Sequence, residues 1–473
     1  MIHATKVAII GGGLAGLSAA KKLNEAKVET VLFEASEHFG GRVGTKINPY
    51  GKAFYNTGGE FIDSTQLEIR KLVRELGLDL KTWYESSNKN LVETVIYDGK
   101  NFEAEHEYLE PFYSKHSDER KYLKKLVGDI KLLKSDGASS RAQRIKHMSI
   151  KDYILTELEF PDKLAKYLFS TLESYYAQEV DMITAGAIDE LLIDLDKRVY
   201  AASTKHDEKY RVVGGTGKMI EALLRAMPTW NYITAYSNTP VNQISKSGDK
   251  YIINNQYDEV FDYVISTLPP PILKTIEVDV DGYQKTMAHV LEERNYPYGV
   301  VANVYLFFEQ RVWKSTPYTD DFGQHHHGYD GRVIFLNEAM NLWDETNGQL
   351  DDRGHEIPEG ILRAYFIGDV VEEKFIQQSP EHINQVIVQP MLDKLEEIWP
   401  GLKHAYQGFR FNAYRYAYAG AVPPGVSYKT WGSYPLRVGN LILAGEFFDI
   451  GEDQSFMNGA IKSGYRAADM IKS

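Results

Sequence analysis

Apolar and polar residues follow one another in blocks near the start of the chain, and these blocks predict a strand, a helix and a second strand. Residues 6–10, KVAII, are almost wholly apolar, which is typical of a buried parallel strand. After a glycine turn, residues 14–25 are amphipathic and carry small side chains on one helical face. A second strand is expected over 28–34, so the segment predicts a βαβ unit. A further helix over 66–76 ends at Gly77.

The rest of the chain gives mixed patterns. Residues 80–205 are rich in Lys, Glu and Tyr and mostly helical in pattern, whereas residues 316–359 are rich in Asp, Gly and His, which predicts loops. Further strands are expected around 241–244, 251–253, 261–267, 300–308 and 440–444, and further helices over 380–399 and 457–471.

The glycine turn carries the first candidate chemistry. Gly11, Gly13 and Gly16 fit G-x-G-x-x-G directly after a strand and at the start of a helix. In a dinucleotide site the first glycine permits the turn, the second admits the pyrophosphate and the third lets helix and strand pack closely. Glu34 ends the next strand, 18 residues after Gly16, close to the spacing of a carboxylate that binds ribose hydroxyls. The pattern therefore predicts a dinucleotide cradle rather than a plain βαβ turn.

Composition narrows the remaining choices. The 473 residues allow two or three domains, and 53 Lys and Arg against 66 Asp and Glu give a net charge of −13, which argues against nucleic acid or an anionic membrane as partner. The absence of cysteine excludes disulfides and thiolate chemistry. No apolar stretch long enough for a membrane anchor and no leader pattern stand out, so a cytoplasmic protein is expected, as monomer or homodimer. His325, His326 and His327 lie in a predicted loop without further ligands at metal-site spacing, so no metal site is predicted.

A second glycine element follows the cradle. Gly40 and Gly41 permit another close backbone approach, and Arg42 can pair with a phosphate. With Glu34 before them and Thr45 after them, these residues resemble the N-terminal pattern of the flavin-dependent amine oxidase family, which includes monoamine, polyamine and L-amino acid oxidases.

The resemblance continues along nearly the whole chain, in the family's order. It covers the stretches GGEFI at 58–62, YRVVGGTGK at 210–218, PV at 240–241, STLPP at 266–270 and AGE at 444–446 with SFMNGAIKSGYRAA at 455–468. In the family these segments surround FAD. The resemblance implies that Glu446 lies near the ribityl and pyrophosphate groups and that Met457 begins a helix aimed at the flavin ring. The implied FAD-binding residues are Gly11, Gly13, Leu14, Ala15, Gly16, Glu34, Ala35, Gly40, Gly41, Arg42, Gly58, Gly59, Glu60, Phe61, Val241, Thr267, Gly445, Glu446, Phe456 and Met457.

The expected fold is α/β: a doubly wound, Rossmann-like FAD-binding domain with an inserted α+β substrate domain on a mixed sheet. The FAD-binding domain is expected to comprise residues 1–80, 206–275 and 426–473, and the substrate domain residues 81–205 and 276–425. The first segment of the substrate domain is expected to be largely helical.

Several positions depart from the family pattern. Ser36 and His38 stand where relatives often carry two arginines near the adenosine. Ala417 stands where some relatives attach the flavin through a cysteine, so FAD is expected to be bound non-covalently.

Three residues are the candidate catalytic groups that the resemblance implies. Tyr418 and Phe456 would form the aromatic pair that holds the substrate before the flavin, although a shift of register would replace Tyr418 by Tyr416. Both rings can equally be plain core. Asn303 stands where amine oxidases carry a lysine facing flavin N5. Because side chains alternate along a strand, Asn303 shares one face with the residues two positions before and after it. An amide carries no charge, so the reduced flavin is expected to react slowly with oxygen. Another cation, for example from residues 80–205, could take the place of the lysine.

The resemblance implies an oxidoreductase that removes a hydride from a carbon bearing an amine, followed by hydrolysis of the imine and reoxidation by oxygen. The substrate is expected to be a small amine or amino acid. Two alternatives stay open: a desaturase or dehydrogenase of the carotenoid and porphyrinogen oxidase type, and a non-catalytic flavin-bound partner protein.

Overall fold

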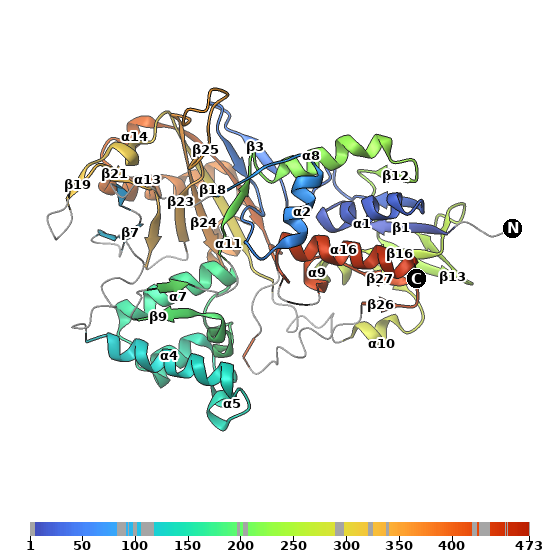
Figure 1. The fold of residues 1–473 in the computed structure, drawn as a ribbon, viewed down its shortest axis with the longest axis horizontal. Helices are drawn as coiled ribbons and strands as arrows, with labels where there is room; N and C mark the ends of the chain where they lie inside the picture. Colours follow the sequence, from blue (N-terminus) through green and yellow to red (C-terminus); the bar gives the residue numbers. More distant parts are fainter. Residues whose placement is uncertain are drawn as a thin grey trace.

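The computed structural model describes most of the chain. The described residues are 5–82, 91–92, 94–97, 102–105, 118–195, 199–201, 207–288, 298–319, 325–336, 340–418, 423–424, 436–449, 451 and 453–472. Along its longest axis the molecule has two halves, one built around β1 and α16 and the other around β18 and β25 (Figure 1).

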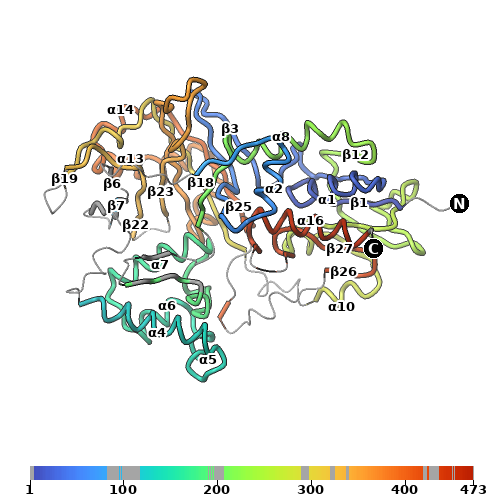
Figure 2. Tube along the Cα trace, viewed as in Figure 1, coloured from blue at the N-terminus to red at the C-terminus, as the bar shows by residue number. Residues whose placement is uncertain are grey.

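The first half is built on a six-stranded sheet. β12, β2, β1, β16 and β27 are parallel neighbours in that order, and β26 pairs antiparallel with β27 at the edge. Figure 2 shows that blue, green and red stretches of the chain meet here, so three separated segments build one sheet. Its strands are β1 (Lys6–Ile10), β2 (Glu29–Phe33), β12 (Ile233–Tyr236), β16 (Tyr263–Ser266), β26 (Arg437–Val438) and β27 (Leu441–Leu443).

Helices α1 (Leu14–Glu25) and α16 (Met457–Lys472) pack against each other beside this sheet (Figure 1). Their backbones approach closely, because a Cβ at Gly464 would lie 2.3 Å from the backbone oxygen of Ala15. The small side chains predicted along one face of α1 are therefore explained by this contact. The other helices of this half are α2 (Leu67–Glu75), α8 (Gly217–Ala226), α9 (Pro270–Leu273) and α10 (Tyr283–Met287).

A four-stranded sheet of order β15-β14-β13-β17 extends the first half. β13 and β14 form the hairpin that the sequence predicts, with Gly248 at a φ of +61° in its turn. The strands are β13 (Gln243–Ser247), β14 (Lys250–Ile253), β15 (Val260–Phe261) and β17 (Glu277–Asp279). Shorter pairs elsewhere are β3 (Thr45–Ile47) with β4 (Phe54–Asn56), β5 (Leu80–Thr82) with β11 (Tyr210–Val212), β6 (Leu91–Val92) with β21 (Gly328–Tyr329), β9 (Leu192–Asp194) with β10 (Val199–Ala201), and β19 (Tyr318–Thr319) with β20 (His325–His326).

The second half is built on a mixed seven-stranded sheet of order β25-β18-β24-β23-β22-β7-β8. Only β22 and β7 are parallel, and the other neighbours are antiparallel. The strands are β7 (Thr94–Tyr97), β8 (Phe102–Glu105), β18 (Val301–Phe308), β22 (Val333–Phe335), β23 (Met340–Asp344), β24 (Gly360–Ile367) and β25 (Tyr406–Tyr414).

The predicted alternation along β18 is confirmed. Val304 and Leu306 belong to a large core cluster that includes α13, whereas Tyr305 faces the other way and donates from its hydroxyl to the backbone oxygen of Asn56 at 2.6 Å. Asn303 lies on the same face as Tyr305, toward the loop after β4.

Helices cover this sheet on two sides. α4, α5 and α7 lie together below it in Figure 1, with α7 in contact with β23 and β24. The helices of this half are α4 (Arg120–Ser135), α5 (Ser140–Lys146), α6 (Ile150–Asp152), α7 (Asp162–Tyr176), α11 (Asp369–Lys374), α12 (Pro380–Ile383), α13 (Gln389–Ile398) and α14 (Leu402–Ala405). π-helical turns cover Tyr153–Glu157 and Asn384–Val388, and 3-10 turns cover Ala185–Glu190, Met227–Thr229, Val312–Ser315 and Glu446–Phe448.

One regional prediction is confirmed and one is wrong. The described residues of 80–205 are mostly helical, as predicted, although their first part contains strands, because β7 pairs with β22 and β8 with β7. In contrast to the loops that were predicted, the described residues of 316–359 include five strands, and two of them, β22 and β23, belong to the seven-stranded sheet. In both places strand formation depends on partners far away in the sequence, which local composition does not report.

The predicted mixed α/β class is confirmed, whereas the five segment boundaries stay predictions. Among the described helices, none is long and apolar enough to cross a membrane.

Candidate functional site

The glycines between β1 and α1 form an open loop at the carboxyl end of β1. Gly11 has a φ of +101°, and a Cβ on Gly16 would lie 1.9 Å from the backbone oxygen of Gly11, so only glycine fits there. A Cβ on Gly13 would meet only the Cα of Gly41, at 3.9 Å. The loop thus leaves the backbone accessible at Gly13, as a bound pyrophosphate requires.

The second glycine element lies on this loop. Gly13 and Gly40 form a parallel bridge, and the N–H of Gly40 donates to the oxygen of Gly12 at 2.9 Å. Leu14 and Ala15 lie in the first turn of α1, so the positive end of the helix dipole lies beside the glycine loop.

Glu34 follows β2 and holds the glycine loop from the other side. Its Oε2 accepts from the N–H of Gly12 at 2.7 Å, and its Oε1 accepts from the N–H and hydroxyl of Ser36, each at 2.8 Å. The N–H of Thr239 donates to the backbone oxygen of Glu34 at 2.8 Å, and buried Val241 follows two residues on. The structure therefore brings the segment before β13 beside the predicted ribose carboxylate.

The carboxyl ends of the central strands meet at this edge. The hydroxyl of Thr267, after β16, donates to the backbone oxygens of Ile10 and Gly11 at 2.9 and 3.1 Å. A Cβ on Gly445, after β27, would lie 3.2 Å from the oxygen of Thr267. Ala35 directly follows Glu34 at the end of β2.

Arg42 and Glu446 form an ion pair at this edge, and Arg42 also bonds to the segment that follows β25 of the second half. Nη1 of Arg42 lies 3.0 Å from Oε1 of Glu446 and donates to the backbone oxygen of Ala417 at 2.9 Å. The hydroxyl of Tyr298 donates to the same Oε1 at 2.9 Å. Burial lowers the pKa of Arg42, but Glu446 and Tyr298 together outweigh this effect, so the pKa is raised. Burial also raises the pKa of Tyr298 well above its ordinary value.

The side chains at this edge fit FAD. Oε2 of Glu446 is buried and has no hydrogen-bond partner among the described residues. A buried carboxylate oxygen of this kind is costly unless a ligand supplies a donor. Together with the open backbone at Gly13, it gives the cofactor both a cradle and an unsatisfied acceptor.

The loop at 58–61 lies on Arg42. A Cβ on Gly58 would lie 2.0 Å from the backbone oxygen of Arg42, and the N–H of Gly59 donates to that oxygen at 3.1 Å. Sδ of Met457, the first residue of α16, would lie 2.9 Å from a Cβ on Gly59. A side chain at Gly58 or Gly59 would therefore disrupt this loop. The loop leads directly to Glu60.

Glu60 belongs to a buried cluster of two acids and two arginines. Its carboxylate pairs with Arg211 of β11 and with Arg363 of β24. Oε2 of Glu345 lies 3.5 Å from Arg211 and 3.8 Å from Arg363. Burial raises the pKa of Glu60, while the guanidiniums of Arg211 and Arg363 act against this and favour the ionised carboxylate. The rings of Phe61 and Trp343 cover the guanidiniums of Arg211 and Arg363, at 5.0 and 5.1 Å.

Asn303 lies in a row of polar residues across the seven-stranded sheet. It pairs with Asn412 of β25 on one side and with Tyr365 of β24 on the other, and Tyr365 pairs in turn with Asn341 of β23. Residues directly opposite one another share a face, so the four side chains line the same side of the sheet.

A cation holds the Asn303 side chain. Nε of Arg363 donates to Oδ1 of Asn303 at 2.8 Å, and Asn303 is 1% exposed. This bond fixes the amide orientation, with Nδ2 directed away from Arg363. Among the described residues, the cation that contacts Asn303 therefore comes from β24; a cation from residues 80–205 stays a prediction.

The structure connects Tyr418 to this row. Its hydroxyl lies 2.9 Å from that of Tyr365, while Ala417 accepts from Arg42. Tyr416, the alternative, is 39% exposed and lies edge-on to Tyr298. Phe456 immediately precedes α16 and the Met457 contact. A cage formed by Tyr418 and Phe456 stays a prediction.

Sequence reasoning missed Arg211, Glu345 and Arg363. Arg363 had a visible signal, since it is one charge within the otherwise apolar run GILRAYFI at 360–367. Charges are rarely buried unless paired, so an arginine in a buried strand indicates an acidic partner, although not which one.

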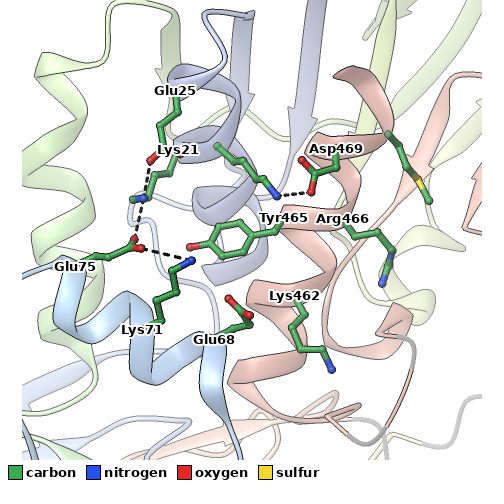
Figure 3. Close-up of a pocket in the computed structure, with 11 residues that line it drawn as sticks. Lys21, Glu25, Glu68, Lys71, Glu75, Lys462, Tyr465, Arg466 and Asp469 are labelled. Atoms are coloured by element: carbon green, nitrogen blue, oxygen red, sulfur yellow. Dashed lines mark hydrogen bonds and ion pairs between the residues drawn. The ribbon is translucent and has the colours of Figure 1, made fainter. Parts of the chain in front are cut away.

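A pocket elsewhere lies between α1, α2 and α16, away from the glycine loop (Figure 3). Its charges compensate one another: Nζ of Lys21 lies 2.7 Å from Glu25 and 3.1 Å from Glu75. Within the described part of the chain, no group of three or more His, Asp or Glu residues could hold a metal ion.

Comparisons with known proteins show to which family the chain belongs. The family model described as flavin containing amine oxidoreductase matches residues 14–472. Amine oxidase [flavin-containing] A of Sus scrofa is 24% identical, over 99% of this chain and 85% of its own length. The corresponding B enzyme of Canis lupus familiaris is 23% identical, over 98% of this chain and 85% of its own.

Solved structures share the fold. Wild-type putrescine oxidase bound to putrescine matches with a TM-score of 0.73 at 18% identity, covering 99% of each chain. Cyclohexylamine oxidase from Brevibacterium oxydans IH-35A matches with a TM-score of 0.75 at 17% identity, again covering 99% of each chain. The chain belongs to the flavin-containing amine oxidoreductase family.

Proposed function

We propose that this protein uses non-covalently bound FAD to oxidise a small amine to an imine, which water then hydrolyses. The observation that carries the proposal is the contact between the two halves at Glu60. This residue ends the loop that lies on Arg42 of the cradle, and it pairs with Arg363, which holds Asn303. The cofactor edge of one sheet thus meets the polar row of the other.

The glycine loop and the N-terminus of α1 would hold the pyrophosphate of FAD. Glu34 would bind the ribose, and Glu446 would accept a hydrogen bond from a donor group of the cofactor. When bound, FAD would accept the hydride and later pass the electrons to oxygen. Tyr365, Tyr418 and Trp343 would exclude water and favour the neutral amine, whose lone pair assists loss of the hydride.

A simple amine fits better than an amino acid. An amino acid needs a cation for its carboxylate, and Arg211 and Arg363 near the polar row already pair with Glu60 and Glu345. Substrate recognition by these arginines would break a buried ion pair, which is costly.

A panel of amines and amino acids, read by peroxide release, tests the function. Release of peroxide with amines is expected. Anaerobic reduction of the flavin by a polyene or porphyrinogen, with no amine active, would favour the desaturase alternative. A flavin spectrum unchanged by every compound would favour a non-catalytic partner protein.

Non-covalent binding has its own test. Acid precipitation should release the yellow chromophore into the supernatant, because Ala417 offers no thiol. Colour retained in the pellet would contradict this expectation. Cytoplasmic location and a monomeric or homodimeric state also stay predictions.

Slow reaction with oxygen is the second part of the proposal. The amide of Asn303 is neutral, and the charge of Arg363 beside it is balanced by Glu60. Transfer of the first electron to oxygen forms an anion that an uncompensated cation would stabilise. Loss of such a contact typically costs about a hundredfold to a thousandfold in rate.

Asn303→Lys should therefore speed reoxidation measured by stopped flow, without a comparable gain in the reductive half-reaction. Wild-type reoxidation at a normal oxidase rate, unchanged in the variant, would show that Arg363 or another group already supplies the charge.

A further inference from the structure

Helix α16 holds the 3-10 turn Glu446–Phe448 (the Glu446 turn) at both ends. Gly445, with a φ of +115°, leads from β27 into this turn, and its N–H donates to the hydroxyl of Ser463 at 3.0 Å. At the other end, Nη2 of Arg466 donates to the backbone oxygen of Phe448 at 2.6 Å. The turn is therefore fixed by two side chains of one helix.

Ser463 and Arg466 lie three positions apart in α16, so they share one face of the helix. Ser463 is completely buried, and its hydroxyl donates to the backbone oxygen of Ala460 at 2.9 Å. Because the hydroxyl proton is used within the helix, a lone pair of the oxygen faces the N–H of Gly445. The buried N–H would have no partner without this serine.

The surroundings of Arg466 are unfavourable for a charge that serves stability alone. Nη1 lies 4.0 Å from the carboxylate of Asp449, which Lys462 already holds at 3.0 Å. Nε is buried and has no hydrogen-bond partner among the described residues. Burial lowers the pKa of Arg466, and Asp449 compensates only in part. Since a buried cation without a close counterion costs free energy of folding, the bond to Phe448 is better explained by the position of the turn.

The position of the turn decides where the carboxylate of Glu446 lies. Oε1 accepts from the hydroxyl of Tyr298 and pairs with Arg42, whereas Oε2 is buried without a partner among the described residues. Hydrogen bonds weaken steeply when distance and angle change. A shift of the Glu446 turn would therefore weaken the pair with Arg42 and the bond that Oε2 offers to a cofactor.

We propose that Ser463 and Arg466 are positioning residues for FAD, which hold the Glu446 turn where its carboxylate can accept a hydrogen bond from the cofactor. This inference rests on the proposed use of FAD. Both residues act through Glu446, so the loss of either should reduce FAD affinity only while the Glu446 carboxylate is present.

The first test is the FAD affinity of each variant, measured from flavin fluorescence during serial dilution of the holoenzyme. Arg466→Ala should weaken FAD binding by about 10- to 100-fold, the value of a hydrogen bond from a charged group. Arg466→Lys should recover part of this loss, because an ammonium group can still donate to Phe448. Ser463→Ala should weaken binding by about fivefold or more, since it leaves the buried N–H of Gly445 unpaired.

Ser18→Ala and Lys22→Ala are the matched controls in helix α1. Ser18 is completely buried, and its hydroxyl has no hydrogen-bond partner in the described part of the chain. Lys22 lines the same pocket as Arg466 but pairs with Asp469. Both controls should keep the wild-type FAD affinity within about twofold. Losses as large as those of the α16 variants would show a general effect of the two helices and overturn the proposal.

A double-mutant cycle separates positioning from a general effect on the fold. In the Glu446→Ala background the turn no longer presents a carboxylate, so adding Arg466→Ala should lower FAD affinity by no more than about two- to threefold. The same fold loss with and without Glu446 would mean that Arg466 does not act through this residue, which contradicts the proposal.

Chemical rescue tests the role of Arg466 without a second substitution. Arg466 lines the pocket of about 680 Å³ shown in Figure 3, and its side chain is 20% exposed, so a guanidinium ion can enter the space left in Arg466→Ala. Guanidinium chloride, far below denaturing concentrations, should raise the FAD affinity of this variant, whereas potassium chloride at equal ionic strength should not. Equal affinities in the two salts would refute the role of Arg466.

The outcomes separate this inference from the proposed function. If wild type binds FAD and the Arg466 and Ser463 variants bind it equally well, only the positioning role fails. If wild type binds no FAD, the proposed function itself fails.

Discussion

The two sheets hold their functional residues by opposite means. At the carboxyl edge of the six-stranded sheet the site depends on missing side chains, as the 1.9 Å approach at Gly16 shows. On the seven-stranded sheet it depends on side chains that are present, since Asn303 is held by Arg363, and Arg363 by Glu60. The glycine loop of the six-stranded sheet should therefore not tolerate an added side chain. The buried cluster on the seven-stranded sheet should not tolerate the loss of a charge.

The largest effect is expected from Arg363→Met, which keeps much of the side-chain volume and removes the charge. Glu60 and Glu345 would lose a buried partner, which typically costs about 3–5 kcal/mol in the free energy of unfolding. Urea denaturation of the variant and wild type measures the loss.

Arg415→Met is the matched control, because Arg415 pairs with Glu372 at 3.0 Å and the two side chains are 49% and 37% exposed. Such pairs contribute about 0–1 kcal/mol. Similar losses in the two variants would mean that the buried cluster is not a stability element. Adding Glu60→Gln to Arg363→Met should recover part of the loss.

The same contrast explains what the sequence could predict. The bounds of β1 and α1 agree with the expected ones because apolar periodicity and glycine spacing are local signals. The pair of Arg363 with Glu60 joins residues far apart in sequence, and nothing local indicates the partner. The short strand β22 lies in a loop-like stretch and is fixed by pairing with β7 and β23.

The next effect concerns Glu173 and depends on pH. Its pKa is about 7 in the folded protein, above the ordinary value of 4.5. The folded state thus binds the proton more tightly, so this contribution to stability is fully present below pH 4.5 and is lost as pH rises through about 7. Glu173→Gln should gain about 2–3 kcal/mol relative to wild type between pH 5 and pH 8.

Denaturation at the two pH values measures this gain, with Asp181→Asn as control. A constant difference between Glu173→Gln and wild type would show that the carboxylate is well solvated.

Gly16→Ala tests the other side of the comparison. The added methyl would displace the backbone of Gly11, and overpacking of this kind typically costs about 1–3 kcal/mol. FAD content, measured by absorbance of the purified protein, should fall sharply. Gly128→Ala in α4 is the control, because nothing lies within 4 Å of a Cβ there; it should keep its FAD. Normal FAD content in Gly16→Ala would refute the cradle.

The smallest effect is expected from Phe456→Ala, at the aromatic cage to which both halves of the molecule would contribute. Phe456 precedes α16 of the first half, whereas Tyr418 bonds to Tyr365 of the second, so an aromatic cage would need both. Phe456→Ala should raise the KM or lower the turnover by about two- to tenfold, the value of one aromatic contact, with normal FAD content. Tyr257→Ala, at a ring that is 68% exposed, controls for loss of an aromatic side chain. Kinetics equal to those of Tyr257→Ala would leave the substrate in contact with the seven-stranded sheet alone, and Phe456 would then be a packing residue at the start of α16.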